Sequence, residues 1–308
     1  MASSGDVLAD RRFAWAEAAF ADDDFDVAAD LARQALDLSP DYAPAWLLLG
    51  RAIEGAGRDG REAALAAYGR ARELDGVDVL GAGLHLARLG AADPAGAMSA
   101  AYVTRLFDEY AIRFDRHLRR SLAYRAPELL HDAVRRACSA RLRPVRFAGA
   151  LDLGCGTGLA AEAFRPVCGR IAGVDLSAAM VAKAEAKRLY DELATGDLVG
   201  WLRERADGSA DLALAADVFV YVPDLGPAFA ETARVLGPGG LFAFTVQAGT
   251  GDGVSLGDDH RFAHGPGYVR GLADRNGFAV AILEDASTRQ DRGADVPGLL
   301  AVLEKGPG

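Results

Sequence analysis

A short glycine-rich stretch constrains the fold of this chain more than any other feature. Residues 151–158 read Leu-Asp-Leu-Gly-Cys-Gly-Thr-Gly; they follow the apolar run 147–151 and precede a helical stretch, 159–164. A strand that enters a glycine turn and then a helix presents unpaired backbone N–H groups to a ligand, because glycine has no side chain in the way. The stretch therefore predicts the first strand–turn–helix unit of a ligand-binding parallel sheet.

The glycine spacing argues against a nicotinamide-dependent oxidoreductase, which is the weaker alternative. A dinucleotide-binding fold shows Gly-x-Gly-x-x-Gly and an acid about 20 residues later. In this chain the third glycine comes one residue early, and an aspartate precedes the first glycine. Two further short apolar segments are followed by Asp175 and Asp197. An acid at a strand end can accept hydrogen bonds from both hydroxyls of a ribose.

Together these features resemble class I S-adenosylmethionine-dependent methyltransferases, and the resemblance extends from about Val145 to the C-terminus. It implies that the glycine turn holds the amino-acid part of the cofactor, that Asp175 binds the ribose and that Asp197 contacts the adenine amino group. Asp217 is expected to open the loop that faces the reactive sulfonium. The stretch 233–244 is similar to the family's helix, tight turn and fifth strand. The cofactor-binding residues that the resemblance implies in this core are Asp152, Gly154, Cys155, Gly156, Gly158, Asp175, Leu176, Asp197, Leu198 and Asp217.

The family's topology implies a Rossmann-like α/β core with a seven-stranded sheet whose last strand is antiparallel. Short runs of Val, Leu, Ile and Ala alternate with glycine-rich turns and helical stretches in this part of the chain, as βαβ units require. Strands are expected near residues 147–153, 170–174, 191–194, 211–216, 240–246, 279–284 and 297–303.

The chain before this core is rich in Ala, Leu and Arg, with apolar residues at helical spacing. Two segments match each other and resemble the tetratricopeptide repeat, a helix–turn–helix unit with small residues where its helices cross. We therefore expect an all-α tetratricopeptide-like domain at 1–98, a helical cap at 99–143 and a methyltransferase domain at 144–308. This organisation resembles the bacterial tetratricopeptide-containing methyltransferases. The matching positions are Ala28, Ala32, Ala35, Leu38 and Pro40 in one segment and Ala64, Tyr68, Ala71, Leu74 and Gly76 in the other.

The segment between the two parts carries an apolar stripe at helical spacing. Residues 107–115 read Phe-Asp-Glu-Tyr-Ala-Ile-Arg-Phe-Asp. They resemble the Tyr-Asp-x-x-Ala-x-x-Tyr-Asp stretch that precedes many methyltransferase cores and caps the cofactor. Phenylalanine replaces the first and last aromatic residues, so only Tyr110 keeps a hydroxyl, and the resemblance implies that Tyr110 contacts the cofactor. The alternative is a face that only packs on a core.

Charge and cysteine content limit the classes of partner. The 34 Lys and Arg residues against 44 Asp and Glu give a net charge of −10, whereas nucleic acids and anionic membranes are bound by basic faces. The three cysteines form no Cys-x-x-Cys pair, which favours a reducing compartment over a disulfide framework or a metal site. We therefore expect a cytoplasmic protein without nucleic-acid, membrane or metal partners.

Methyl transfer from a sulfonium needs alignment and exclusion of water more than acid catalysis, because the leaving thioether takes no proton. A base is needed only when the nucleophile starts protonated. The glycine-rich insertion 247–267 is expected to form a loop over the sheet edge, with His264 as the candidate catalytic base. Tyr221, His260 and His264 are the expected acceptor-pocket residues. The alternative is that both histidines bond only to backbone or solvent.

The predicted function is methyl transfer to an O, N or C nucleophile of an acceptor that the sequence does not identify. A small molecule is favoured because the core carries no basic face. Two alternatives stay open: a protein acceptor recruited by the repeats, and a non-catalytic scaffold or assembly factor that keeps the cofactor-binding fold. The repeats could also serve as an oligomerisation surface, and the oligomeric state does not follow from the sequence.

Overall fold

The computed structural model describes residues 3–57, 60–291 and 293–307 and divides into two compact units, Met1–Tyr102 and Val103–Gly308. Each unit has its own hydrophobic core. Most of the predicted helical cap therefore belongs to the second unit. In the described residues, no helix is both long enough and apolar enough to cross a membrane.

The first unit is a succession of helices, as the sequence predicts. Neighbouring helices pack in pairs, α1 with α2 and α3 with α4. The side chain of Asp6 caps the first helix, since it accepts the backbone N–H groups of Leu8 and Ala9 at 2.7 and 2.9 Å. The elements are α1 (Val7–Ala21), α2 (Phe25–Leu38), α3 (Ala43–Gly55), α4 (Arg61–Leu74), α5 (Ala82–Arg88) and a short 3-10 helix, Pro94–Gly96.

Small residues let these helices approach closely. A Cβ atom at Gly50 of α3 would lie 2.5 Å from the ring of Tyr68 in α4, and one at Gly55 would lie 2.7 Å from the ring of Phe25 in α2. Tyr68 is fully buried, and its hydroxyl donates to Glu54 at 2.7 Å. The helical pairs expected from the spacing are therefore present, with a glycine at two of their crossings.

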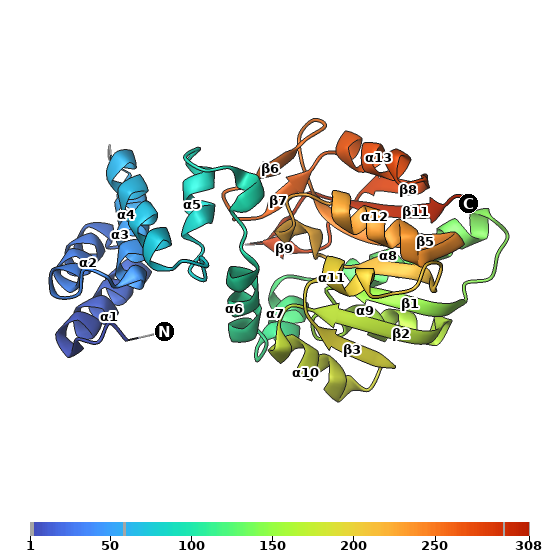
Figure 1. Cartoon of the computed structure of the whole chain (residues 1–308), viewed down its shortest axis with the longest axis horizontal. Helices are drawn as coiled ribbons and strands as arrows, with labels where there is room; N and C mark the ends of the chain where they lie inside the picture. Colours follow the sequence, from blue (N-terminus) through green and yellow to red (C-terminus); the bar gives the residue numbers. More distant parts are fainter. Residues whose placement is uncertain (1–2, 58–59, 292, 308) are drawn as a thin grey trace. The chain divides into compact units, whose positions relative to one another are not determined.

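The second unit is built on a sheet in the order β3-β2-β1-β4-β5-β11-β8, which Figure 1 shows with helices on both faces. Strands β3, β2, β1, β4 and β5 run parallel, whereas β11 is antiparallel to both β5 and β8. All seven expected strands are present, and the antiparallel one is the last in the chain. Their bounds are β1 (Phe147–Leu153), β2 (Cys168–Asp175), β3 (Glu192–Thr195), β4 (Ala210–Ala215), β5 (Leu236–Ala248), β8 (Phe278–Asp285) and β11 (Gly298–Lys305).

The insertion after β5 contains regular structure where the sequence predicts a loop. Strands β6 (Val254–Leu256) and β7 (Phe262–His264) form an antiparallel pair, and β7 also runs parallel to the end of β5. Close glycine packing makes this possible, because a Cβ at Gly265 would lie 1.9 Å from the carbonyl oxygen of Gly251. The insertion therefore extends the sheet. Strands β9 (Gln290–Asp291) and β10 (Ala294–Asp295) form a separate small pair.

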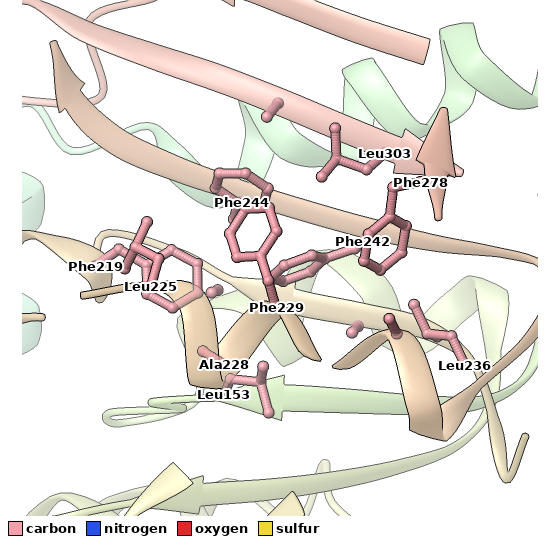
Figure 2. Close-up of a cluster of buried hydrophobic side chains, with 14 of the residues drawn as sticks. Leu153, Phe219, Leu225, Ala228, Phe229, Leu236, Phe242, Phe244, Phe278 and Leu303 are labelled. Atoms are coloured by element: carbon pink, nitrogen blue, oxygen red, sulfur yellow. The ribbon is translucent and has the colours of Figure 1, made fainter. Parts of the chain in front are cut away.

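Helices cover both faces of the sheet, and each face has its own apolar cluster. Phe229 of α12 packs against Phe242 and Phe244 of β5, with ring centroids 5.3 Å apart in each pair (Figure 2). Leu241 and Ala243, the alternate residues of β5, belong to the opposite cluster, as strand periodicity requires. The helices are α6 (Ala100–Tyr110), α7 (Phe114–Ser121), α8 (Ala126–Ala140), α9 (Leu159–Phe164), α10 (Ala178–Lys187), α11 (Leu198–Arg203), α12 (Gly226–Val235) and α13 (Pro266–Arg275).

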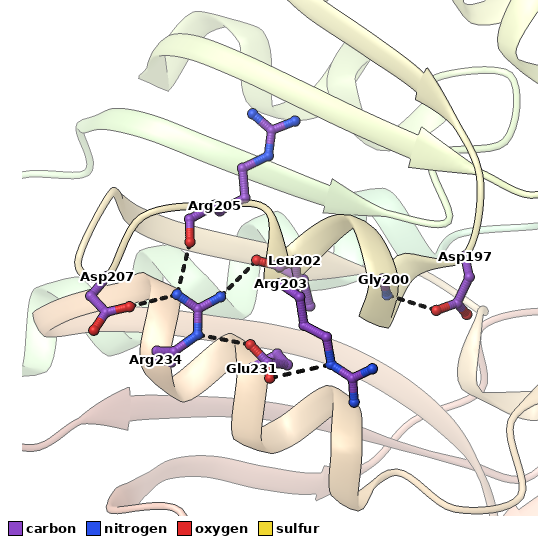
Figure 3. A network of polar contacts seen from close by, with 8 residues as sticks. All are labelled: Asp197, Gly200, Leu202, Arg203, Arg205, Asp207, Glu231 and Arg234. Atoms are coloured by element: carbon purple, nitrogen blue, oxygen red, sulfur yellow. Dashed lines mark hydrogen bonds and ion pairs between the residues drawn. The ribbon is translucent and has the colours of Figure 1, made fainter.

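One arginine ties α11 to α12. Arg234 donates to the backbone carbonyls of Leu202 and Arg205, both at 2.8 Å, and pairs with Asp207 and Glu231 (Figure 3). This network fixes α11, whose N-terminus follows β3, against the helix that precedes β5. The network lies just before the starts of β4 (Ala210) and β5 (Leu236), at the amino ends of these parallel strands.

Candidate functional site

The glycine turn after β1 has a backbone that glycine adopts without strain. The φ angles of Gly154, Gly156 and Gly158 are 69°, 51° and 87°, in the left-handed region. A Cβ at Gly154 would lie 2.6 Å from Val218, and one at Gly158 would lie 2.9 Å from the ring of Tyr190. The turn therefore packs tightly against Val218 and Tyr190, and its three glycines place no side chains over the backbone N–H groups of the turn.

The acid that ends β2 lies beside this turn. Asp175 accepts the backbone N–H groups of Gly156 and Ser177, each at 2.9 Å. Its own carbonyl accepts the N–H of Gly196 at 2.9 Å, which brings the end of β3 to the same place. Burial raises the pKa of the Asp175 carboxyl. Three motifs that are separate in the sequence are thus adjacent in the fold.

Asp152, in β1, has a buried carboxylate that is only partly satisfied. It is 1% exposed, and its Oδ2 accepts the hydroxyl of Tyr190 at 2.6 Å, whereas its Oδ1 has no hydrogen-bond partner within the protein. Burial raises the pKa of Asp152 to about 7. A buried acceptor without a donor is costly. The orphaned oxygen therefore fits a cationic N–H donor such as an ammonium group.

Asp197, Leu198 and Leu176 lie at the ends of β3 and β2. The Asp197 carboxylate caps α11 by accepting the N–H of Gly200 at 2.7 Å (Figure 3). Leu198 is half-buried against the apolar cluster, and Leu176 precedes Ser177, the N-cap of α10. All three are therefore at the sheet edge where the strand-end motifs were expected to converge.

Cys155 is a packing residue of the turn. It is 5% exposed, and its N–H donates to Val174 at 2.9 Å. Burial raises the pKa of its thiol, so the thiol stays protonated at neutral pH. Across the part of the chain that the structure describes, no group of three or more His, Cys, Asp or Glu residues could hold a metal ion.

Two aspartates tie the cap helices to this edge. Asp108 of α6 accepts the hydroxyl of Ser177, at the N-terminus of α10. Asp115 of α7 accepts the hydroxyl of Thr157 in the glycine turn and pairs with Lys187 at 2.8 Å. These are the two aspartates of the motif at residues 107–115, seven positions apart. They anchor one cap helix beside Asp175 and the other at the turn itself.

The aromatic residues of the cap form a half-buried cluster with Tyr221. The ring centroid of Phe107 lies 6.1 Å from that of Phe114 and 5.2 Å from that of Tyr221. The ring centroids of Tyr110 and Phe114 lie 5.1 Å apart. The Tyr110 hydroxyl is hydrogen-bonded to Nδ1 of His117. Tyr110 and Tyr221, predicted independently, therefore belong to one cluster that spans the cap and the end of β4.

Asp217 follows β4 and pairs with a buried arginine. Its φ is 61°, and its N–H donates to the hydroxyl of Thr245 at 2.9 Å. Its carboxylate pairs with Arg289, whose side chain is 3% exposed. Arg289 also donates to Oε1 of Gln247 at 3.0 Å, and Gln247 donates to Asp259 at 3.2 Å. A polar chain thus crosses the sheet edge beside the aromatic cluster.

His264 does not lie in a flexible lid. It is the last residue of β7, is fully buried, and its Nε2 lies 3.1 Å from the carbonyl oxygen of Val222. Burial lowers the pKa of His264 to about 4. A base that has no exposed surface in the structure has no route to an acceptor, so its placement opposes the role predicted for it. His260 lies in the turn before β7, with a φ of 57°.

Several residues of this edge were not predicted from the sequence. Asp108 and Asp115 belong to the motif at residues 107–115, but from this motif only Tyr110 was predicted to contact the cofactor. Tyr190 and Arg289 had no local signal, because each reaches the site from a segment that carries no motif. Arg261 follows His260 in the insertion expected to border the acceptor, but it was not itself predicted. Only the fold brings Tyr190 to Asp152 and Arg289 to Asp217.

Comparison with known proteins agrees with the geometry. Residues 151–244 match a family described as a methyltransferase domain. The chain is 33% identical over 98 residues to malonyl-[acyl-carrier protein] O-methyltransferase of Yersinia pestis, covering 32% of this chain and 36% of that protein. It is 31% identical over 141 residues to squalene methyltransferase 1 of Botryococcus braunii, covering 42% and 35%. The chain thus spans less than half the length of these curated relatives.

A solved structure extends the similarity of the fold over more of the chain. Magnesium protoporphyrin IX methyltransferase from Synechocystis PCC 6803, with bound S-adenosylmethionine, superimposes with a TM-score of 0.50 at 16% identity, covering 67% of this chain and 97% of that one. At this identity the likeness shows the fold alone. Together, the match over residues 151–244 and the sheet topology show that the second unit carries a class I methyltransferase domain, whose cofactor is S-adenosylmethionine.

Proposed function

We propose that the protein transfers a methyl group from S-adenosylmethionine to an O, N or C nucleophile of a small or carrier-bound acceptor. One observation carries this proposal: the aromatic cap is fastened to the glycine turn by Asp115 and to the end of β2 by Asp108. A cap held in this way covers the reaction edge with apolar rings, which exclude water from it.

The cofactor contacts follow from the polar groups of this edge. The orphaned Oδ1 of Asp152 is suited to the ammonium group of the cofactor. Each carboxylate oxygen of Asp175 retains a lone pair for a ribose hydroxyl, because it accepts one backbone N–H. Asp197 and Leu198, at the end of β3, are suited to the adenine. When bound, S-adenosylmethionine supplies a methyl group on a sulfonium.

The protein's own task in this reaction is alignment. Asp217 and Tyr221, which follow β4, are proposed to face the reacting atoms, and the Asp217–Arg289 pair holds that loop in place. The buried His264 is not proposed as a base. An acceptor whose nucleophile is already deprotonated needs none. His260 and Tyr221 are the polar groups that we propose border the acceptor, and Tyr110 of the cap is proposed to contact the cofactor.

The relatives support an acceptor that is small or attached to a carrier. Their names specify a malonyl group on acyl-carrier protein and squalene, and this chain's net charge of −10 gives no basic surface for nucleic acid. The helical first unit is proposed to be a tetratricopeptide-like array that binds a partner. A protein acceptor recruited by this array is the second candidate, favoured by its paired helices.

A methyl-label transfer screen tests the proposal. The full chain would be incubated with S-adenosylmethionine labelled on its methyl group and with metabolite extract or lysate, and labelled products would be separated by size. We expect label in small molecules or in a carrier protein. Label in larger proteins would instead support recruitment by the first unit. Binding of the cofactor without transfer to any fraction would favour the non-catalytic scaffold.

Cofactor affinity should rise with pH through about 7. The pKa of Asp152 in the unliganded protein is raised to about 7, and an ammonium partner requires the ionised carboxylate. Below pH 7, binding must release this proton, so affinity should fall by up to about tenfold per pH unit. Calorimetry with S-adenosylhomocysteine at pH 6 and pH 8 measures this. In Asp152→Asn the pH dependence should disappear; if it persists, another group is responsible.

His264 should control acid stability and not the rate of reaction. Its pKa is lowered in the fold to about 4 from an ordinary 6.5, so its contribution is complete above pH 6.5 and is lost as the pH falls toward 4. His264→Gln should therefore flatten the decline in unfolding free energy over this range, by up to about 1.4 kcal/mol per pH unit. Urea unfolding at pH 7, 6 and 5 measures the slope. A turnover that loses its pH dependence in this variant would restore His264 as a base.

A further inference from the structure

Arg261 differs from Arg234 and Arg289, whose guanidiniums are each paired with a carboxylate. Arg234 pairs with Glu231 and Asp207, and Arg289 pairs with Asp217. Arg261, just before β7, is half-buried, and no carboxylate among the described residues lies within salt-bridge distance of its guanidinium. A half-buried guanidinium without a carboxylate partner is costly as a purely structural group.

The guanidinium of Arg261 lies against the aromatic cluster. Its guanidinium lies over the ring of Tyr221, 6.0 Å from the centroid. Tyr221 contacts Phe107 of the cap edge-on at 5.2 Å. The Tyr221 hydroxyl lies close enough to Arg261, Asp217 and Arg289 for the charges of all three to act on it.

The nearest acid in sequence is already engaged. One oxygen of Asp259 accepts the backbone N–H of Arg261 and the other accepts the amide of Gln247, both at 3.2 Å. The Arg289 guanidinium is balanced by Asp217. The charges of Asp217 and Asp259 act on the Arg261 guanidinium, but neither carboxylate is within salt-bridge distance of it. Its planar fork, which is the geometry that recognises carboxylates, is therefore not engaged by an acid of the described residues.

The geometry points to Arg261 and Tyr221 as the site that holds a carboxylate of the acceptor, whose apolar body lies against Phe107 and Phe114. This inference rests on the proposed methyl transfer. A carboxylate is favoured over a phosphate because one guanidinium and one phenol supply the donors here, without a helix N-terminus at the site. A cationic amine acceptor is disfavoured, because it would meet Arg261 as well as the sulfonium of the cofactor.

The test uses the full chain saturated with S-adenosylhomocysteine and titrated with benzoate and hexanoate, each compared with its uncharged amide. At least one acid should bind at least tenfold more tightly than its amide. Arg261→Met should remove that preference, and Arg261→Lys should retain part of it. Arg113→Met is the matched control: Arg113 also lies over a tyrosine of the cluster, Tyr110, at 5.5 Å, but it is exposed, so the preference should be unchanged.

Several outcomes would overturn the inference. These are binding of neither acid, equal binding of acids and amides, or an acid preference that survives Arg261→Met. Tighter binding of phenyl phosphate than of benzoate would overturn the assignment to a carboxylate. The affinity for S-adenosylhomocysteine, measured on each variant, shows whether it is folded. If the unmodified chain does not bind S-adenosylhomocysteine, the proposed function itself is contradicted. If it binds S-adenosylhomocysteine but neither acid, only this inference is contradicted.

Discussion

Replacing Arg289 by alanine is expected to lower the free energy of unfolding by about 3 kcal/mol. The side chain of Arg289 is 3% exposed and that of Asp217 is 18% exposed, so the variant would leave a largely buried carboxylate without its counter-charge. It would also free Oε1 of Gln247. Urea unfolding at pH 7 measures the loss. The effect is large because the remaining charge is left unpaired in a poorly hydrated place.

The double variant Arg289→Met/Asp217→Asn distinguishes the effect of an unpaired charge on stability from the effect of lost side-chain packing. If the loss in Arg289→Ala comes from an unpaired carboxylate, removing both charges while keeping side-chain volume should recover most of the stability. Arg165 offers a matched control, since it pairs with Asp191 at 2.8 Å but both side chains are about a third exposed. Arg165→Ala should cost about 1 kcal/mol or less. An equal loss in the two alanine variants would show that burial of the Asp217 pair is not the cause.

Structural features that depend on contiguous residues, such as the glycine turn and the strands, were predictable from the sequence. The glycine turn and its flanking strand and helix follow from Gly154, Gly156 and Gly158, because positive φ angles and close packing at such turns require glycine. The expected strands are present for the same reason, since βαβ units are short local patterns. The acids at the strand ends then meet at one edge because parallel strands end together.

Contacts between distant segments were not predictable in this way. Arg289 lies 72 positions from Asp217, and Asp108 lies 69 positions from Ser177. The incorrect loop prediction for residues 247–267 has a related cause: glycines in the insertion predicted a loop, whereas they allow Gly265 and Gly251 to pack closely and β7 to join β5. A glycine in the sequence indicates that the backbone can adopt more conformations. Whether it lies in a mobile loop or at a close contact depends on the surrounding fold.

Replacing Asp175 by alanine is expected to weaken binding of S-adenosylmethionine by about 1.5–3 kcal/mol, or about 10- to 150-fold. The variant removes the proposed acceptor of the ribose hydroxyls. It also removes the acceptor of the Gly156 and Ser177 N–H groups, so the glycine turn loses its link to β2. Calorimetry with S-adenosylmethionine and S-adenosylhomocysteine would measure both affinities, and both should fall alike because they share the ribose.

Two variants distinguish ribose binding from support of the turn. Asp175→Asn keeps one oxygen acceptor and the side-chain volume, so it should retain the turn better than Asp175→Ala while losing the charge that strengthens the ribose hydrogen bonds. Asp207→Ala removes an exposed acid that pairs with Arg234 and should leave cofactor affinity unchanged. If Asp175→Ala unfolds at the same urea concentration as the unmodified protein and binds the cofactor equally well, Asp175 does not hold the ribose. The ribose would then have to be bound from another element of this edge, and the turn would not depend on the two hydrogen bonds that Asp175 accepts.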